Sequence, residues 1–220
     1  MTEHADQFTS FPDELTRVPG LLGDITDWIE RNDPYPNRPL AFAAALATIS
    51  FAASGKYRFM DVGPELRILA IGPSGFGKVI ALHRALALLR CAGMGDSVYS
   101  GFVSPEAVRD LRSLGKPILW YEEQFDQWAI RDKRSGAILD AAFDDNGHPV
   151  VFHGQCTAEG FDKACRTSRR FLDFAAGCMI IDAAPYTDVR VPGNFDAVSI
   201  PNALIDGIAR LRDGRERAIA

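Results

Sequence analysis

The chain has 220 residues, of which 47% are hydrophobic and 24% are charged, and its formal net charge is −5 at neutral pH. This length favours one α/β domain with a substantial core over two full domains, and the composition favours neither a disordered nor a membrane protein. The acidic balance excludes a globally basic nucleic-acid coat and leaves room only for a local basic patch.

Cysteine usage and apolar runs indicate the compartment. The four cysteines Cys91, Cys156, Cys165 and Cys178 form no C-x-x-C pair and no metal-ligand spacing with the four histidines, which favours free thiols. Residues 1–18 lack the apolar region of a signal peptide. The most apolar run, residues 40–53, is short for a membrane span. We therefore expect a cytoplasmic protein without a membrane segment.

The N-terminal part of the chain is predicted to be helical. Residues 1–18 carry no apolar period and are predicted to form a flexible leader. Apolar residues then recur with helical spacing up to Asn32, and a second, alanine-rich helix is predicted over 40–54 after the turn at 35–39. Residues 19–63 are thus predicted to form a helical prefix, with a loop length typical of an αα-hairpin.

From residue 64 to 200 the pattern changes to short apolar runs that alternate with helical segments. Five runs read as strands, over residues 66–71, 97–102, 116–123, 148–154 and 177–183. Strands that alternate with helices predict a mostly parallel sheet covered by helices on both faces, which is an α/β fold. Residues 201–220 are predicted to form a C-terminal amphipathic helix and a charged tail.

A phosphate-binding loop is the strongest motif of the chain. The match to G-x-x-x-x-G-K follows the apolar run 68–71 and precedes a helical run, which is the context that this motif requires. Glycines let successive amides point into one concavity, and the lysine reaches the outer phosphates. A glycine-rich turn with a surface lysine is the alternative. The residues predicted to bind nucleotide are Gly72, Pro73, Ser74, Gly75, Phe76, Gly77, Lys78 and Val79.

Val79 departs from the motif, which normally ends in Ser or Thr. Without that hydroxyl, Mg²⁺ loses one ligand and must take a water or another side chain. Nucleotide binding survives such a change more readily than rapid hydrolysis does. Ser74 supplies a hydroxyl within the loop.

Two carboxylates, Glu122 and Glu123, follow the apolar run that begins at Pro117. In phosphate-loop NTPases the first acid of such a pair orients the metal, and the second positions the attacking water. Glu122 is therefore the predicted metal ligand and Glu123 the predicted base, although the first acid is usually aspartate. The alternative is a strand end with solvated carboxylates.

A polar strand end provides a third candidate, in the segment 150–157. In NTPases that couple hydrolysis to movement, the strand between the loop strand and the acid strand carries a polar group near the γ-phosphate. Gln155 is the predicted group, and Thr157 is the second choice or a helix cap. Arg166, Arg169 and Arg170 form a basic cluster that reads as a solvated helix face or as a trans-acting arginine finger.

Several segments together resemble the helicase-like ATPase domain of phage, prophage and plasmid replication proteins, which is often associated with a primase. The resemblance covers roughly residues 19–210 and rests on PGLLGDITDWIERNDPYPNRPLAFAAALA, LAIGPSGFGKVIALHRALALL, SGFVSPEAV, PILWYEEQF and GQCTAEGF. It implies a RecA-like ATPase core that uses ATP and Mg²⁺. It also implies a homo-oligomeric ring that acts on single-stranded DNA beside a replication partner such as a primase.

Two departures from that family leave alternatives open. Cys178 stands where the family usually has an arginine, and Glu122 replaces an aspartate. One alternative is a degenerate NTPase that serves as a nucleotide-dependent scaffold or loader with little hydrolysis. Another is a small-molecule phosphotransferase, for which no lid or acceptor pocket is recognisable in the sequence.

Overall fold

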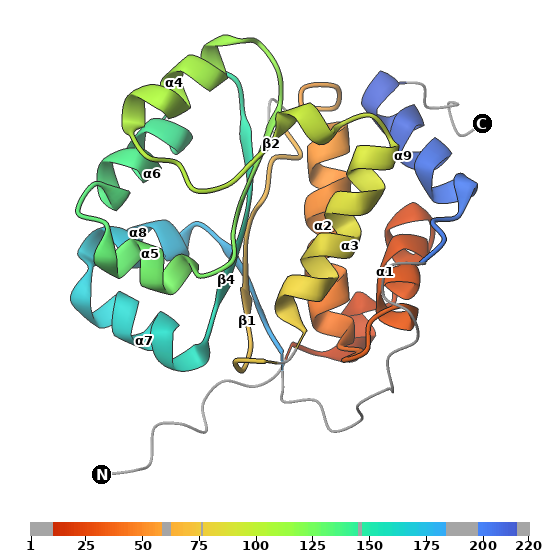
Figure 1. The fold of residues 1–220 in the computed structure, drawn as a ribbon, viewed down its shortest axis with the longest axis horizontal. Coiled ribbons are helices and arrows are strands. Elements are labelled where there is room, and N and C mark those ends of the chain that lie inside the picture. Colours follow the sequence, from red (N-terminus) through yellow and green to blue (C-terminus); the bar gives the residue numbers. More distant parts are fainter. Residues whose placement is uncertain (1–10, 59–62, 76, 145–146, 184–197, 215–220) are drawn as a thin grey trace.

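The structure is a computed structural model that describes residues 11–58, 63–75, 77–144, 147–183 and 198–214. Two layers of helices enclose a central sheet (Figure 1). Among the predicted site residues, Phe76 lies outside the described residues, as do parts of the predicted leader, prefix, core and tail.

The sheet has five strands, all parallel, in the order β2-β3-β4-β1-β5. The strands are β1 (Arg67–Ile71), β2 (Val98–Tyr99), β3 (Ile118–Glu122), β4 (Val150–Cys156) and β5 (Met179–Asp182). β4 pairs with β1 on one side and with β3 on the other, so that Gln155 lies beside Ala70 and Gly154 beside Glu122. Because all strands are parallel, their carboxyl ends meet at one edge of the sheet.

Helices cover both faces of the sheet (Figure 1). One face packs against α1 (Leu21–Arg31), α2 (Arg38–Ala53), α3 (Lys78–Cys91) and α9 (Asn202–Asp213). The other packs against α4 (Pro105–Ser113), α5 (Phe125–Arg131), α6 (Ser135–Phe143), α7 (Ala158–Thr167) and α8 (Arg169–Ala176). The predicted α/β class with a parallel sheet covered on both faces is therefore confirmed.

Side-chain alternation along the central strand β4 divides the core into two halves. Val151 belongs to the cluster under α2 and α3, whereas Phe152 belongs to the cluster under α4 to α8. Successive residues of a strand point to opposite faces, so His153 and Gln155 share the α3 side with Val151. The opposite half is rich in aromatic contacts, such as the Trp120 and Phe152 rings with centroids 5.0 Å apart.

Two elements differ from the sequence-based prediction. β2 contains only two residues, because the chain reaches Gly101, whose φ is 64°, and then Ser104, which caps α4. The helix α8 was not predicted, although its apolar residues Phe171, Phe174 and Ala175 are spaced to face one side. The helix begins with two arginines, so charge rather than an apolar period is the more prominent feature of this segment.

The described part of the predicted leader contacts the rest of the fold. Residues Asp13–Thr16 form a 3₁₀ helix, η2, and a further short 3₁₀ helix, η3, covers Gly95–Ser97. The Phe11 ring lies 6.1 Å from the Phe42 ring, and the Phe11 amide donates to the Asp182 carbonyl at 2.7 Å. These contacts attach the segment before α1 to both α2 and the edge strand β5.

The helices α1 and α2 pack against each other and against the sheet. The Asn37 side chain caps α2 by accepting from the Leu40 amide at 3.2 Å, and Pro39 occupies the first turn, where no amide hydrogen is needed. Nearly all of α2 is buried, as its alanine-rich sequence predicts. Among the described helices, none combines the length and apolarity needed to cross a bilayer.

Candidate functional site

The predicted phosphate loop runs from the end of β1 to the start of α3, at the carboxyl edge of the sheet. Gly75 and Gly77 have φ values of 81° and 79°, which L residues with a side chain rarely adopt. Gly77 is the N-cap residue of α3, and a Cβ at Gly75 would meet nothing within 4 Å. The loop is therefore open on the Gly75 side, and the free amides at the start of α3 lie beside it.

Lys78 is the first residue of α3 and its side chain folds back over the loop. Its Nζ donates to the carbonyl oxygens of Gly72 and Pro73, both at 2.6 Å. Burial lowers the pKa of Lys78, and the charge of Asp126 opposes that shift. An ammonium has three hydrogens, so two carbonyl contacts leave one for an anion in the loop.

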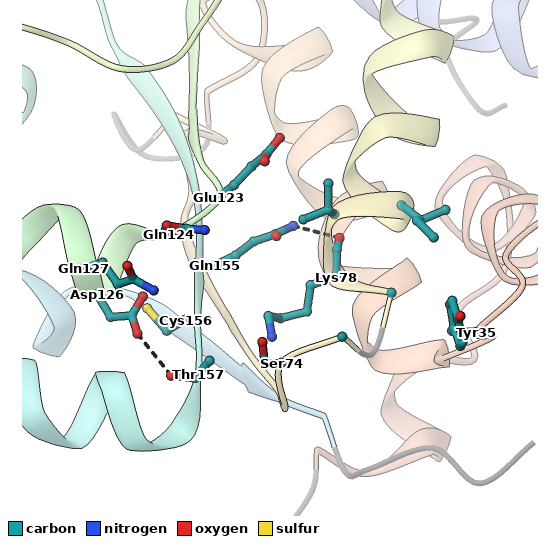
Figure 2. A pocket seen from close by; sticks show the side chains of 14 residues that line it. Tyr35, Ser74, Lys78, Glu123, Gln124, Asp126, Gln127, Gln155, Cys156 and Thr157 are labelled. Atoms are coloured by element: carbon teal, nitrogen blue, oxygen red, sulfur yellow. Dashed lines mark hydrogen bonds between the residues drawn. The ribbon is translucent and has the colours of Figure 1, made fainter. Parts of the chain in front are cut away.

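A cavity of about 310 Å³ lies against this loop. Figure 2 shows the side chains around it, which come from the loop and the start of α3, from the end of β4, from the β3–α5 connection and the start of α5, and from the turn before α2. The lining residues are Tyr35, Ser74, Gly75, Gly77, Lys78, Val79, Ile80, Glu123, Gln124, Asp126, Gln127, Gln155, Cys156 and Thr157.

Gln155 connects β4 to the first turn of α3. Its Nε2 donates to the Lys78 carbonyl at 2.8 Å, as the dashed line in Figure 2 shows. The side chain is 1% exposed, and its Oε1 has no hydrogen-bond partner among the described residues. A buried acceptor without a donor is costly, so this oxygen is a candidate to receive a hydrogen bond from a ligand or a water.

Asp126 and Thr157 form a second polar pair in the cavity wall. The Thr157 hydroxyl donates to the Asp126 carboxylate at 3.1 Å (Figure 2). It also accepts from the Gly160 amide at 3.0 Å. Asp126 is buried, and a Cβ at Gly160 would lie 1.5 Å from its Oδ2, so only glycine admits this carboxylate. Thr157 is thus the N-cap of α7 as well as a cavity residue.

The predicted acid pair is divided by strand alternation. Glu123 lines the cavity, and its Oε1 lies 2.9 Å from the Nε2 of His83 on α3. Glu122 is not among the lining residues. Its Oε2 accepts from the Gly101 amide at 3.2 Å, and burial raises its pKa. The structure therefore brings Glu123 beside the loop and directs Glu122 toward the β2–α4 connection.

The cavity wall offers oxygen ligands to a cation, although the described residues contain no group of three or more His, Cys, Asp or Glu side chains that could hold a metal ion by themselves. Val79 contributes no oxygen, but Ser74, Glu123 and Asp126 lie in the wall. Mg²⁺ commonly keeps several waters and binds through one or two carboxylates together with substrate phosphates. The residues present therefore fit a nucleotide-bound Mg²⁺ better than an independent metal centre.

The other sequence-based candidates lie away from the cavity. Arg166 and Arg169 make i,i+4 ion pairs with Asp162 and Asp173 at 2.9 Å, and Arg170 lies 3.7 Å from Asp140; all three arginines are exposed. These pairs fit the predicted solvated helix face. Burial raises the pKa of the Cys178 thiol to about 12, and its Sγ contacts the Phe174 carbonyl at 3.4 Å.

Several cavity residues were not predicted from the sequence. Asp126 occupies the first turn of α5, three residues after Glu123, and this short spacing is the signal that would have indicated it. Tyr35 comes from the turn between α1 and α2. Its position between two prolines indicates a turn with a restricted backbone, and this was the only signal in the sequence. Gln124 and Gln127 carry no comparable signal.

A scan against models of known protein families and a search of curated proteins both find no match to this chain.

Proposed function

We propose that the protein binds ATP at this cavity and hydrolyses it, as a RecA-like member of the phosphate-loop NTPases. The observation that carries the proposal is the loop between β1 and α3, where Lys78 and the open glycine segment face one cavity with Gln155 and Glu123. The strand order adds support, because β4 lies between the loop strand and the acid strand.

The proposed chemistry assigns a role to each of these groups. The loop amides and the Lys78 ammonium bind the β- and γ-phosphates. Glu123 accepts a proton from the attacking water, which bonds to the γ-phosphorus as the bond to the ADP oxygen breaks. Gln155, anchored through Nε2, offers Oε1 as an acceptor to that water, which fits the lack of another partner for Oε1 among the described residues.

Mg²⁺ belongs to the proposal as the partner of the phosphates. It would neutralise charge on the phosphate oxygens and would take ligands from water and from Asp126, the other carboxylate that lines the cavity, while Glu123 keeps the role of base. Glu122, the ligand predicted from the sequence, is bonded to Gly101 outside the cavity wall and does not enter this assignment.

The cellular role that we propose is in DNA replication of a mobile element such as a phage or a plasmid. It rests on the resemblance of the prefix, loop and acid segments to helicase-like replication ATPases. A homo-oligomeric ring, single-stranded DNA and a partner such as a primase belong to this proposal, and so does an N-terminal αα-hairpin formed by α1 and α2.

Calorimetry with ATP and Mg²⁺ tests the proposal. Lys78→Ala should weaken ATP binding by about 2 kcal/mol, or roughly 30-fold, because a charge-assisted hydrogen bond to phosphate is lost. Lys163→Ala, at an exposed position of α7 outside the cavity, is the matched control and should bind ATP normally. Equal affinity of the wild type and the Lys78 variant would overturn the site.

Turnover with and without single-stranded DNA, together with the solution mass, tests the replication part of the proposal. Hydrolysis that DNA stimulates and a mass of several chains are expected for a ring. A monomer whose turnover does not change when DNA is added would contradict the helicase-like role but not the ATPase activity.

A second function, a nucleotide-dependent scaffold with little hydrolysis, is favoured by Val79, whose apolar side chain lines the cavity where a hydroxyl would assist Mg²⁺. Val79→Thr separates the two functions. An ATPase that is slow because it lacks this hydroxyl should gain turnover in the Val79→Thr variant. Unchanged, negligible turnover in both forms with ATP still bound would favour the scaffold.

A further inference from the structure

Among the residues that the structure describes, Tyr35, in the turn between α1 and α2, is the only one before β1 that lines the cavity. In Figure 2 it lies across the loop from Glu123 and Gln155, with Lys78 between them. The two ends of the cavity therefore differ in chemistry. One end carries the carboxylate and amide proposed for hydrolysis, and the other carries an aromatic ring.

The turn that presents Tyr35 is fixed against the loop. Pro34 and Pro36 are buried on either side of it, and the Tyr35 amide donates to the Asp33 carboxylate at 2.8 Å. Proline restricts its own φ and the conformation of the residue before it. A Cβ on Gly77 would lie 3.0 Å from the Tyr35 Cβ, so the two segments are in direct contact.

The ring itself is half-buried, and apolar side chains accompany it. Val79 and Ile80, in the first turn of α3, line the same cavity and are also half-buried. Apart from the Tyr35 hydroxyl, the side chains of this aromatic and aliphatic surface offer no hydrogen-bond donor to a phosphate. It suits a flat, weakly polar group that extends from a phosphate chain held at the loop.

We infer that Tyr35 binds the base of the nucleotide by stacking, and that the site therefore selects a nucleoside triphosphate over a bare polyphosphate. The inference rests on the proposed function, because the loop orients the ligand with its γ-phosphate toward Glu123 and its nucleoside toward Tyr35. The helical segment before the sheet thus becomes part of the nucleotide site, and the valine at position 79 becomes part of its apolar wall.

Two probes, ATP and inorganic tripolyphosphate, separate the contribution of the base from that of the phosphates. Calorimetry on the full chain would compare the wild type with Tyr35→Leu and Tyr35→Phe. Loss of the ring in Tyr35→Leu should raise the Kd for ATP by about 10- to 100-fold, the range expected when one stacked base loses its aromatic partner. The Kd for tripolyphosphate should change by less than about twofold, because the loop remains intact.

Tyr35→Phe keeps the ring and serves as the matched control, with both affinities within about threefold of the wild type. Tripolyphosphate binding by Tyr35→Leu also reports that this variant is folded. Equal ATP affinity in the leucine variant and the wild type would overturn the inference and leave the proposed function standing. A parallel loss of both ligands would overturn it as well, because Tyr35 would then act by supporting the loop. A wild type that binds neither probe would remove the proposed function itself.

Discussion

At the scale of single residues, the division of the acid pair depends on which face of β3 packs against which helices. Ile118 and Trp120 belong to the core half under α4 to α8, and Leu119 belongs to the half under α3. Alternation then directs Glu122 to the first side, where it meets the Gly101 amide. Glu123, the residue after the strand, remains beside the loop and His83.

This division gives a paired prediction for hydrolysis. Glu123→Gln should lower kcat by about 100-fold or more while ATP still binds, because a general base contributes about 10²- to 10⁴-fold. Glu122→Gln is the matched control on the neighbouring residue and should retain kcat within about tenfold. Steady-state turnover and calorimetry would measure both. A loss in the Glu122 variant as large as in the Glu123 variant would restore Glu122 to the metal-side role predicted from the sequence.

His153 makes stability depend on pH. It lies in the middle of β4 with 1% exposure, and neither ring nitrogen has a hydrogen-bond partner among the described residues. Burial lowers the pKa of His153 from 6.5 to about 4. The unfolded chain therefore takes up a proton near pH 6.5 while the folded chain stays neutral, so the stabilisation is complete above pH 6.5 and is lost as the pH falls toward 4.

Between pH 7 and pH 5 this single group should remove about 2 kcal/mol from the free energy of unfolding. In His153→Leu the free energy of unfolding, measured in urea, should therefore fall by about 2 kcal/mol less than in the wild type between pH 7 and pH 5. Val151→Ala, at a buried residue of the same strand that does not titrate, is the comparison variant and should lower stability by a similar amount at both pH values. An identical acid dependence in the wild type and His153→Leu would contradict the assignment.

At the scale of elements, the sequence predicted most strands and helices because their apolar periods are clear. It did not predict α8, where arginines precede the apolar face, and it extended β2 beyond two residues. For the candidate site, the loop was predicted from its glycine-lysine motif, and Gln155 was predicted from the polar end of an apolar strand. Tyr35 and Asp126 did not, because their approach to the loop depends on how separate elements pack.

The junction of β4 and α7 supports a prediction of its own, since Thr157 caps α7 and also satisfies Asp126 of α5. Thr157→Val keeps the shape but removes both hydrogen bonds, and it leaves a buried carboxylate short of a donor. We expect a loss of about 2 kcal/mol in the free energy of unfolding, measured in urea. Thr157→Ser retains the hydroxyl and should stay within about 0.5 kcal/mol of the wild type. A valine variant as stable as the serine variant would show that the pair contributes nothing.

At the scale of the whole molecule, hydrophobic periodicity did not give the strand order. Only the NTPase pattern led us to expect the strand of Gln155 between the loop strand and the acid strand, and β4 does lie between β1 and β3. The two helices α5 and α6 separate β4 from β3 in the sequence. In the sheet β4 lies between β3 and β1, and this position brings Gln155 to the loop. Periodicity identifies a strand but carries no information on its neighbours. The site is thus assembled from four separate parts of the chain, and ligand binding should stabilise the fold that holds them together.

The corresponding prediction concerns thermal unfolding. ATP with Mg²⁺ at 100 times its Kd should add about 2.7 kcal/mol to the stability of the folded state, provided that the unfolded chain does not bind it. For a domain of this size that corresponds to a rise in Tm of about 5–10 °C. Lys78→Ala, with its roughly 30-fold weaker binding, should gain only about 1 kcal/mol, or about 2–4 °C, at the same ATP concentration. Differential scanning fluorimetry measures both shifts, and equal shifts in the two proteins would mean that the nucleotide binds elsewhere than the loop between β1 and α3.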